Sequence, residues 1–347
     1  MRILCAERRK KVMKLSLVCP CYNEGENIEA FYRACTEAFS GKVDSYELIF
    51  INDGSRDNTW DKLSALADEP NVQNIKLINF SRNFGKEAAM YAGLSKAEGE
   101  YTTIIDTDLQ QKPETVLEMI EILDNNPDID CVAAYQEWRR ESKLLVGCKK
   151  LFYKLINKIC DINFRSGASD FRTFRRSVVE AVLSVKECHR FLKGIFSWVG
   201  FNTHYMPYTA DTRAAGKSSW SFWKLLRYAI GGIVSFTTFP LKLASFVGGA
   251  MSAMSLLYML FVVVQKLVWG ISVEGYATII VLILLIGGIQ LLCLGILGEY
   301  ISRIYIQGKH RPICVIKEYK TVRRESAAQL DKGTDGKDGG DGGDDAK

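Results

Sequence analysis

Hydrophobic and polar positions in the first 135 residues repeat in the order strand, loop, helix. An apolar run at residues 15–19 gives way to a polar break at 20–23, and apolar residues then return at helical spacing from Ile28 to Cys35. Further strands are predicted at residues 47–52, 75–80, 101–105 and 131–134, with helices after the second and the third. This alternation predicts an α/β fold, with a mostly parallel sheet and helices on both faces.

Polar residues directly follow three of these predicted strands. They occupy residues 20–24, 53–57 and 106–110. Ligands bind such sheets beyond the carboxyl ends of the strands, which all lie at the same edge. We therefore expect these three loops to converge on one site.

The pattern changes after residue 240. No charged residue occurs at 243–265 or at 275–298, and each gap exceeds the roughly 20 residues that a helix needs to cross a membrane. A buried core helix of a soluble protein can also be apolar on every side. Two long uncharged runs in succession nevertheless favour two transmembrane helices, predicted at 241–266 and 275–299.

Basic residues flank the outer ends of both predicted spans, whereas the linking loop at 266–274 has one charge of each sign. The positive-inside rule therefore predicts an integral membrane protein with both long ends in the cytoplasm. The predicted segments are an N-terminal extension at 1–13, a cytoplasmic α/β domain at 14–220, an interfacial helix at 221–240, the two spans, a cytoplasmic segment at 300–332 and a disordered Gly/Asp-rich tail at 333–347.

Charge and cysteine content indicate which classes of partner and ligand to expect. The net charge of +5 comes with basic residues near the predicted spans, which favours contact with anionic lipid and phosphate. Nucleic acid is not expected, because no basic face interleaved with aromatic residues recurs in the soluble part. The ten cysteines are scattered apart from Cys19 and Cys21, and there are only three histidines. Reduced thiols are therefore favoured over disulfides or zinc.

Two later segments carry weaker patterns. The basic stretch at 138–159 has apolar residues at helical spacing with lysines between them, as an interfacial helix does. The stretch "SGASDFRTFRRSVVEAV" at 166–182 is expected to form a turn and then a helix.

Asp106 and Asp108 lie one residue apart at the end of the fourth predicted strand. Two hard oxygen ligands at that spacing can bind one divalent cation and leave coordination positions for phosphate oxygens and water, which favours Mg²⁺ or Mn²⁺. Asp-x-Asp also occurs in ordinary polar turns, so this motif alone does not establish a metal site.

The combination of motifs is more specific. The stretches "VCPCYNE" at 18–24, "NDGSRD" at 52–57 and "DTDLQ" at 106–110 resemble the family 2 glycosyltransferases of the GT-A fold. Within that family, "SDFRTF", "RAAGKSSW" and "GEYISRIYIQGKHRP" are similar to the polyprenyl-phosphate glycosyltransferases, and the two spans match the undecaprenyl-phosphate glucosyltransferase branch. The resemblance covers about residues 14–318. It implies inverting, metal-dependent transfer of one sugar, glucose from UDP-glucose, to a polyprenyl phosphate at the cytoplasmic leaflet.

The resemblance also implies roles for residues at the sheet edge. The nucleotide-sugar donor would contact Pro20, Tyr22, Glu24, Asp53, Asp106, Asp108 and Arg213, and the metal would be bound by Asp106, Asp108 and Gln110. An ordinary turn at Pro20 and Tyr22 is the competing interpretation. The family has Gly-x-Ser-Lys where this chain has Gly-Lys-Ser-Ser at 216–219, so it stays open whether Lys217 replaces the lysine missing at Ser219.

Asp170 matches the carboxylate that the family uses in catalysis. A lipid phosphate has a second pKa of about 6 and is mostly ionised at neutral pH, so it needs little help from a base. Asp170 is therefore predicted to act either as a base or as an orienting group, with a helix N-cap as the structural alternative. Arg139, Arg140 and Arg172 are the candidates for binding the lipid phosphate, although each could be a solvated surface charge.

Other functions share parts of this pattern. A GDP-mannose-dependent dolichol-phosphate mannose synthase would use the same loops. A processive polysaccharide synthase should have more spans and a Gln-x-x-Arg-Trp motif where this chain has "SSWSFW". A membrane scaffold without activity should have lost Asp106 or Asp108, and both are present. The expected partners are thus a nucleotide sugar, a polyprenyl phosphate, the membrane and, as related enzymes suggest, further copies of the chain.

Overall fold

A computed structural model describes residues 14–72, 74–136, 157–158, 160, 168–188, 190–208, 235–269 and 275–322. Its described strands form one eight-stranded sheet in the order β7-β5-β6-β4-β1-β2-β3-β8. The strands are β1 (Lys14–Cys21), β2 (Ser45–Asn52), β3 (Ile75–Phe80), β4 (Tyr101–Ile104), β5 (Cys131–Gln136), β6 (Ala168–Arg175), β7 (Thr203–Tyr208) and β8 (Ile316–Val322).

The sheet is mostly parallel. β4, β1, β2 and β3 pair in parallel, as do β5 and β7, whereas β6 and β8 run in the opposite direction to their neighbours. The predicted α/β class and its first five strands are confirmed. The ends of β1 to β4 and the beginning of β6 consequently meet at one edge, which we call the carboxyl edge.

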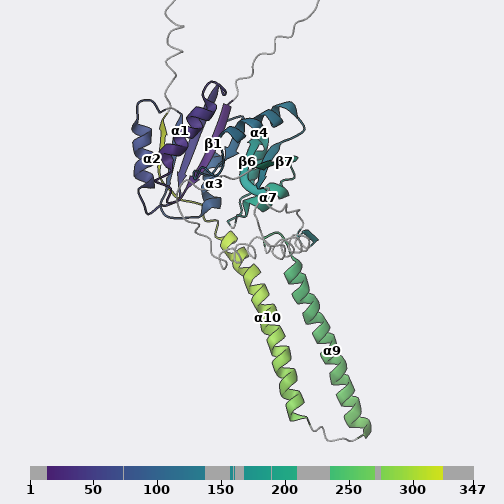
Figure 1. The fold of residues 1–347 in the computed structure, drawn as a ribbon. Coiled ribbons are helices and arrows are strands. Elements are labelled where there is room, and N and C mark those ends of the chain that lie inside the picture. The colour runs from purple at the N-terminus through teal and green to yellow at the C-terminus, as the bar shows by residue number, and fades with distance from the viewer. Residues whose placement is uncertain are drawn as a thin grey trace, which may run out of the picture.

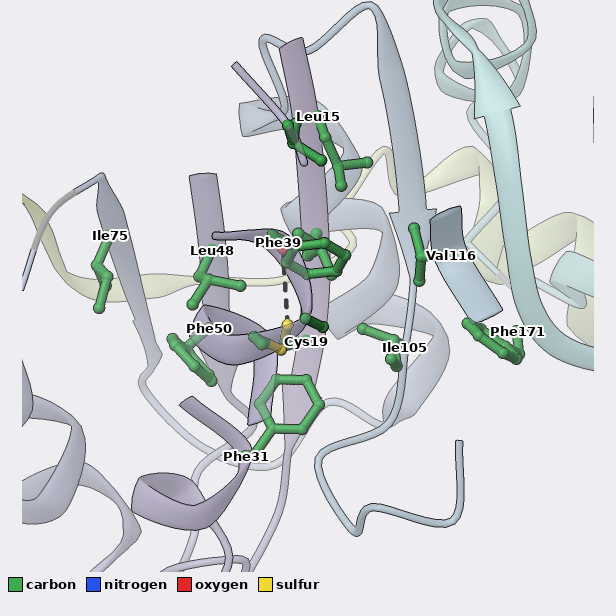
Figure 2. Close-up of a cluster of buried hydrophobic side chains, with 14 of the residues drawn as sticks. Leu15, Cys19, Phe31, Phe39, Leu48, Phe50, Ile75, Ile105, Val116 and Phe171 are labelled. Carbon is green, nitrogen blue, oxygen red and sulfur yellow. Dashed lines mark hydrogen bonds between the residues drawn. The ribbon is translucent and has the colours of Figure 1, made fainter. Parts of the chain in front are cut away.

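Helices cover both faces of the sheet and bury two separate apolar cores. α1 (Ile28–Phe39), α2 (Thr59–Asp68) and α4 (Glu114–Asn125) pack over one face, where Phe31, Phe39 and Phe50 surround Cys19 (Figure 2). α3 (Lys86–Lys96), α6 (Arg176–Ser184) and α7 (Leu192–Trp198) cover the other face. All eight described cysteines are free.

The prediction of a turn and a helix at 166–182 is wrong in its first half. Residues Ala168–Arg175 form strand β6, which pairs antiparallel with both β4 and β5, and α6 begins only at Arg176. Asp170 therefore lies in a strand and does not cap a helix. Pairing with two neighbouring strands outweighs the local polar character that suggested a turn.

Two long helices extend away from the sheet as a hairpin (Figure 1). They are α9 (Phe239–Trp269) and α10 (Tyr276–Gly308), and the segments Phe239–Gln265 and Val281–Gly308 are long and apolar enough to cross a membrane. Neither segment is buried within the structure. Exposed apolar side chains along both helices, such as Phe246 on α9 and Leu291 on α10, form the kind of surface that lipid or another apolar partner covers.

Hydrogen bonds attach the base of this hairpin to the sheet domain. The Cys188 backbone amide donates to Gln307 Oε1 at 2.9 Å, and the Gln307 side-chain amide donates to the Lys186 carbonyl at 2.9 Å. Within the base itself, the Tyr300 hydroxyl donates to the Thr237 carbonyl at 2.8 Å. After α10 the chain returns to the sheet, where β8 pairs antiparallel with β3. The predicted N-terminal extension, the helices at 138–159 and 221–240 for most of their length, and the tail at 333–347 lie outside the described residues.

Candidate active site

The loops at the carboxyl edge surround a cavity of about 260 Å³. Six of the residues predicted to bind the nucleotide sugar line it, and they come from the ends of β1, β2 and β4. The lining comprises Pro20, Cys21, Tyr22, Glu24, Asp53, Asn83, Gly85, Lys86, Ala89, Asp106, Thr107 and Asp108. The expected convergence of the three loops is therefore confirmed.

The loop after β1 is anchored to the start of α2. The Glu24 amide donates to Thr59 Oγ1 at 3.0 Å, and the Gly25 amide donates to Asp57 Oδ2 at 3.2 Å. The Tyr22 side chain is free to present a ring face, because 42% of the residue is exposed. This stretch is thus a fixed loop that leaves an aromatic ring open to the cavity.

Asp53 organises the loop after β3. Its carboxylate accepts hydrogen bonds from the backbone amides of Phe84 at 2.7 Å and Gly85 at 2.9 Å, and from the Asn83 side chain at 3.0 Å. Burial raises the pKa of Asp53, and the two backbone amides partly offset that rise. A residue predicted to touch the base or ribose therefore also holds a neighbouring loop in place.

Gly54 allows that loop to come close. It has φ of +61°, and a Cβ atom there would lie 2.4 Å from the backbone of Arg82 and Asn83. Only glycine meets both conditions without displacing the backbone. The Asp-Gly turn seen in the sequence is thus required by packing between two loops.

Asp106 and Asp108 follow β4 and both face the cavity. Gln111 contacts Asp106 twice, since its Oε1 accepts from the Asp106 amide at 2.9 Å and its Nε2 donates to Asp106 Oδ2 at 3.3 Å. Gln110, predicted as a metal ligand, donates its backbone amide to Asp108 Oδ1 at 3.1 Å. Its role toward a metal stays a prediction.

These two carboxylates fit a divalent cation that is shared with a substrate. The described residues contain no group of three His, Cys, Asp or Glu side chains able to enclose a metal. Mg²⁺ is commonly bound by one or two carboxylates together with substrate phosphates and water, without an all-protein cage. Asp106 and Asp108 supply that smaller donor set.

Lys86 is a site residue that sequence reasoning missed. Its ammonium group lies 2.7 Å from Asp106 Oδ1 and 3.4 Å from Asp170 Oδ2, so it joins the ends of β4 and β6. Burial lowers the pKa of Lys86, but the two carboxylates raise it by more, and the amine stays protonated. Its sequence signal is its place at the start of α3, directly after the loop that follows β3.

Asp170 lies between two ammonium groups. Lys193 Nζ, at the start of α7, is 3.9 Å from Asp170 Oδ1, whereas Lys86 Nζ approaches Asp170 Oδ2. Burial raises the pKa of Asp170, but Lys86, Lys193 and Arg172 together hold that pKa below its usual value. The buried Oδ1 atom accepts no hydrogen bond within the described part of the chain.

Arg172 is buried, although it was predicted to bind a lipid phosphate. Its Nε donates to the Ser169 carbonyl at 3.1 Å, and its guanidinium lies 4.7 Å from the centre of the Phe196 ring. Its lipid-phosphate role stays a prediction. The other arginines proposed for phosphates, Arg139, Arg140 and Arg213, lie outside the described residues, as does Lys217.

Comparison with family models and with known proteins indicates glycosyl transferases in both cases. Residues 16–183 match the model of glycosyl transferase family 2, and residues 239–304 match a GtrB C-terminal hairpin. The bactoprenol glucosyl transferase of Shigella phage SfV is 41% identical over 89% of this chain and 99% of its own. A prophage bactoprenol glucosyl transferase homolog of Escherichia coli is 39% identical over 89% of this chain and all of its own.

The solved structures that match this chain have lower sequence identity to it. A mannosyltransferase from Pyrobaculum calidifontis, in complex with GDP-Man and Mn²⁺, has a TM-score of 0.44 and 18% identity, with 63% of this chain and 61% of that chain covered.

Proposed function

Because the chain belongs to glycosyl transferase family 2, we propose that it transfers one glucose from UDP-glucose to a polyprenyl phosphate in the membrane. The match to bactoprenol glucosyl transferases carries this proposal, since it extends over 99% of the phage protein and includes the hairpin. A nucleotide-sugar pocket and a membrane hairpin in one chain are the two parts that such a reaction needs. The hairpin would span the membrane, with the sheet domain on the cytoplasmic side.

The cavity at the carboxyl edge would receive the donor. Tyr22 offers an aromatic face to the base, and Glu24 and Asp53 offer acceptors for base or ribose. Asp106 and Asp108 would hold Mg²⁺ or Mn²⁺, which would neutralise the diphosphate leaving group. The protonated Lys86 adds a fixed positive charge beside the same carboxylates.

In the proposed reaction, a phosphate oxygen of the lipid attacks the anomeric carbon of glucose. A new carbon–oxygen bond forms there, the bond to the diphosphate breaks, and UDP leaves with the electron pair, which inverts the configuration. The acceptor phosphate is already ionised at neutral pH. Asp170, whose pKa is lowered by three cations, is poorly suited to removing a proton and well suited to holding positive groups in place.

An assay of the purified full-length protein tests the proposal. We would incubate it in detergent with undecaprenyl phosphate and either UDP-glucose or GDP-mannose, with Mg²⁺, Mn²⁺ or EDTA, and detect the lipid-linked sugar by mass spectrometry. We expect glucosyl transfer that needs the metal and falls at least about 100-fold in Asp108→Ala. Asp61→Ala removes an exposed carboxylate on α2 and should leave the rate unchanged.

Product from GDP-mannose alone would replace glucose by mannose in the proposal. No product from either donor, with protein that still binds metal, would contradict it.

A further inference from the structure

We propose that Lys193 binds the phosphate of the lipid acceptor and that Asp170 positions the Lys193 ammonium group. The chemical class of the acceptor rests on the proposed function. The assignment of the residue rests on three observations: the order of the strands, the charges around Asp170, and the place where the hairpin joins the sheet domain.

The order of the strands separates donor from acceptor along the carboxyl edge. β2 and β1, which carry Asp53 and Tyr22, come first, β4 with its two carboxylates follows, and β6 with Asp170 comes next. A nucleotide bound over β1 and β2 would place its diphosphate at β4. In an in-line displacement the attacking group comes from the side opposite the leaving group, so the acceptor belongs beyond β4, at β6 and α7.

The charges around Asp170 distinguish the two lysines beside it. Lys86 spans two carboxylates and lies closer to Asp106, at 2.7 Å, than to Asp170, at 3.4 Å. Lys193 lies 3.9 Å from Asp170 Oδ1, and its side chain is 34% exposed. A partly exposed lysine held near a fixed carboxylate can bind a phosphate with its ammonium group as a point charge.

Arg172, the earlier candidate on this strand, is 3% exposed and lies against Phe196. It contributes positive charge behind Asp170 but offers little surface to a ligand. Lys193, carried by α7 and more exposed than Arg172, is therefore the cation of this group that we assign to the acceptor.

The hairpin meets the sheet domain next to Lys193. A Cβ atom at Gly194 would lie 2.3 Å from the Phe236 ring, and Phe236 precedes α9 by three residues. A cavity of about 710 Å³ lies at this junction, with Trp198 at the end of α7, Phe236 and Tyr300 in its lining. A lipid that lies along the hairpin would thus present its phosphate to the same turn of α7 that carries Lys193.

A binding experiment isolates the phosphate contact. We would measure binding of undecaprenyl phosphate and of the uncharged undecaprenol to the full-length protein in detergent by native mass spectrometry. The ratio of the two affinities reports the headgroup alone, because the prenyl chain is the same. Lys193→Met should reduce that ratio by on the order of tenfold, Lys193→Arg should keep most of it, and Asp170→Asn should reduce it by a smaller factor.

Lys62→Met is the matched control, since Lys62 forms an exposed ion pair with Glu29 on the helices of the opposite face. It should leave the ratio unchanged. In steady-state assays, Lys193→Met should raise KM for undecaprenyl phosphate about tenfold and change KM for UDP-glucose by less than about twofold.

The outcomes separate this proposal from the proposed function. A ratio that is unchanged in folded Lys193→Met, or a wild-type protein that binds the phosphate no better than the alcohol, would overturn the assignment of Lys193. A wild-type protein that prefers the phosphate through Lys193, yet transfers no sugar, would support the assignment and contradict the glucosyltransfer.

Discussion

Lys76 and Lys86 form ion pairs at opposite edges of the same sheet, and the two environments differ in how completely they are closed. Lys76 Nζ lies 2.8 Å from Glu47, 2.9 Å from Glu98 and 2.7 Å from the Lys96 carbonyl, so all three of its hydrogens have acceptors. The Lys76 side chain is 3% exposed, whereas that of Lys86 is 39% exposed and lines the candidate active-site cavity.

The comparison shows that a lysine among carboxylates is not by itself a functional signal. At the amino edge, Glu47 also accepts from the Ser16 hydroxyl and the Glu98 amide, which completes the network. At the carboxyl edge, a carboxylate oxygen of Asp170 is left without a hydrogen bond in the described structure, and the side chains of Lys86 and Lys193 are partly exposed. The unsatisfied Asp170 oxygen and the partly exposed charges beside the cavity distinguish the second group as a place for substrate.

The largest expected effect is the loss of stability on breaking the buried ion pairs of Lys76 with Glu47 and Glu98. Lys76→Met leaves the buried Glu47 without its cation, so we expect the free energy of unfolding to fall by about 3–5 kcal/mol. Urea unfolding followed by circular dichroism measures this change. The exposed Lys62→Met should cost no more than about 1 kcal/mol. A loss as small as that of the control would mean that the network at the amino edge contributes little.

Lys86→Met should lower activity and leave stability nearly unchanged, in contrast to Lys76→Met. We expect transfer activity to fall about 100-fold, because a fixed positive charge beside the reacting groups is lost. The urea midpoint should stay close to that of the wild type, since the Lys86 side chain is partly exposed. Comparing kcat with the urea midpoint tests this, and a lower midpoint with unchanged kcat would reverse the comparison.

Gly54→Ala should lower both the free energy of unfolding and the transfer activity. An added Cβ would meet the loop that leads to Lys86, and a positive φ alone costs of order 1–3 kcal/mol for alanine. Gly41→Ala is a matched control, because its φ is +68° and nothing lies within 4 Å of its Cβ position. Any loss beyond that of Gly41→Ala measures the contact between the loops, and activity should fall only in Gly54→Ala.

The smallest expected effect concerns pH. Lys86, Lys193 and Arg172 outweigh burial and lower the pKa of Asp170, so this group stays ionised down to acidic pH. The value of kcat/KM for the lipid should therefore rise from pH 5 to 7 with the phosphate, whose second pKa is about 6, by up to about tenfold per unit. Asp170→Asn should lower the curve without moving this limb. Disappearance of the limb in the variant would assign it to Asp170.

Much of the fold could be predicted from the sequence because its first five strands are apolar and separated by clear breaks. β6 was missed, since its polar residues suggested a turn and its partners β4 and β5 are distant in the chain. β8 is a short, charged strand, and the feature that defines it is pairing with β3 across about 240 residues.

The sequence predicted the site residues that lie within the recognised motifs. Asp53, Asp106 and Asp108 meet at the cavity because they directly follow parallel strands. Lys86 and Lys193 were missed because a lysine at a helix start usually contacts only solvent. Their roles depend on which loops become neighbours, and the strand order determines that.

The place of β8 has a consequence for how the protein is made. A ribosome completes β1 to β7 and both hairpin helices before it reaches residues 316–322, so the edge of β3 stays open throughout that time. An open strand edge is prone to pairing with other chains. We expect the nascent sheet domain to need protection until the hairpin is inserted, and a soluble truncation that ends before residue 235 to aggregate unless the segment 313–322 is supplied in trans.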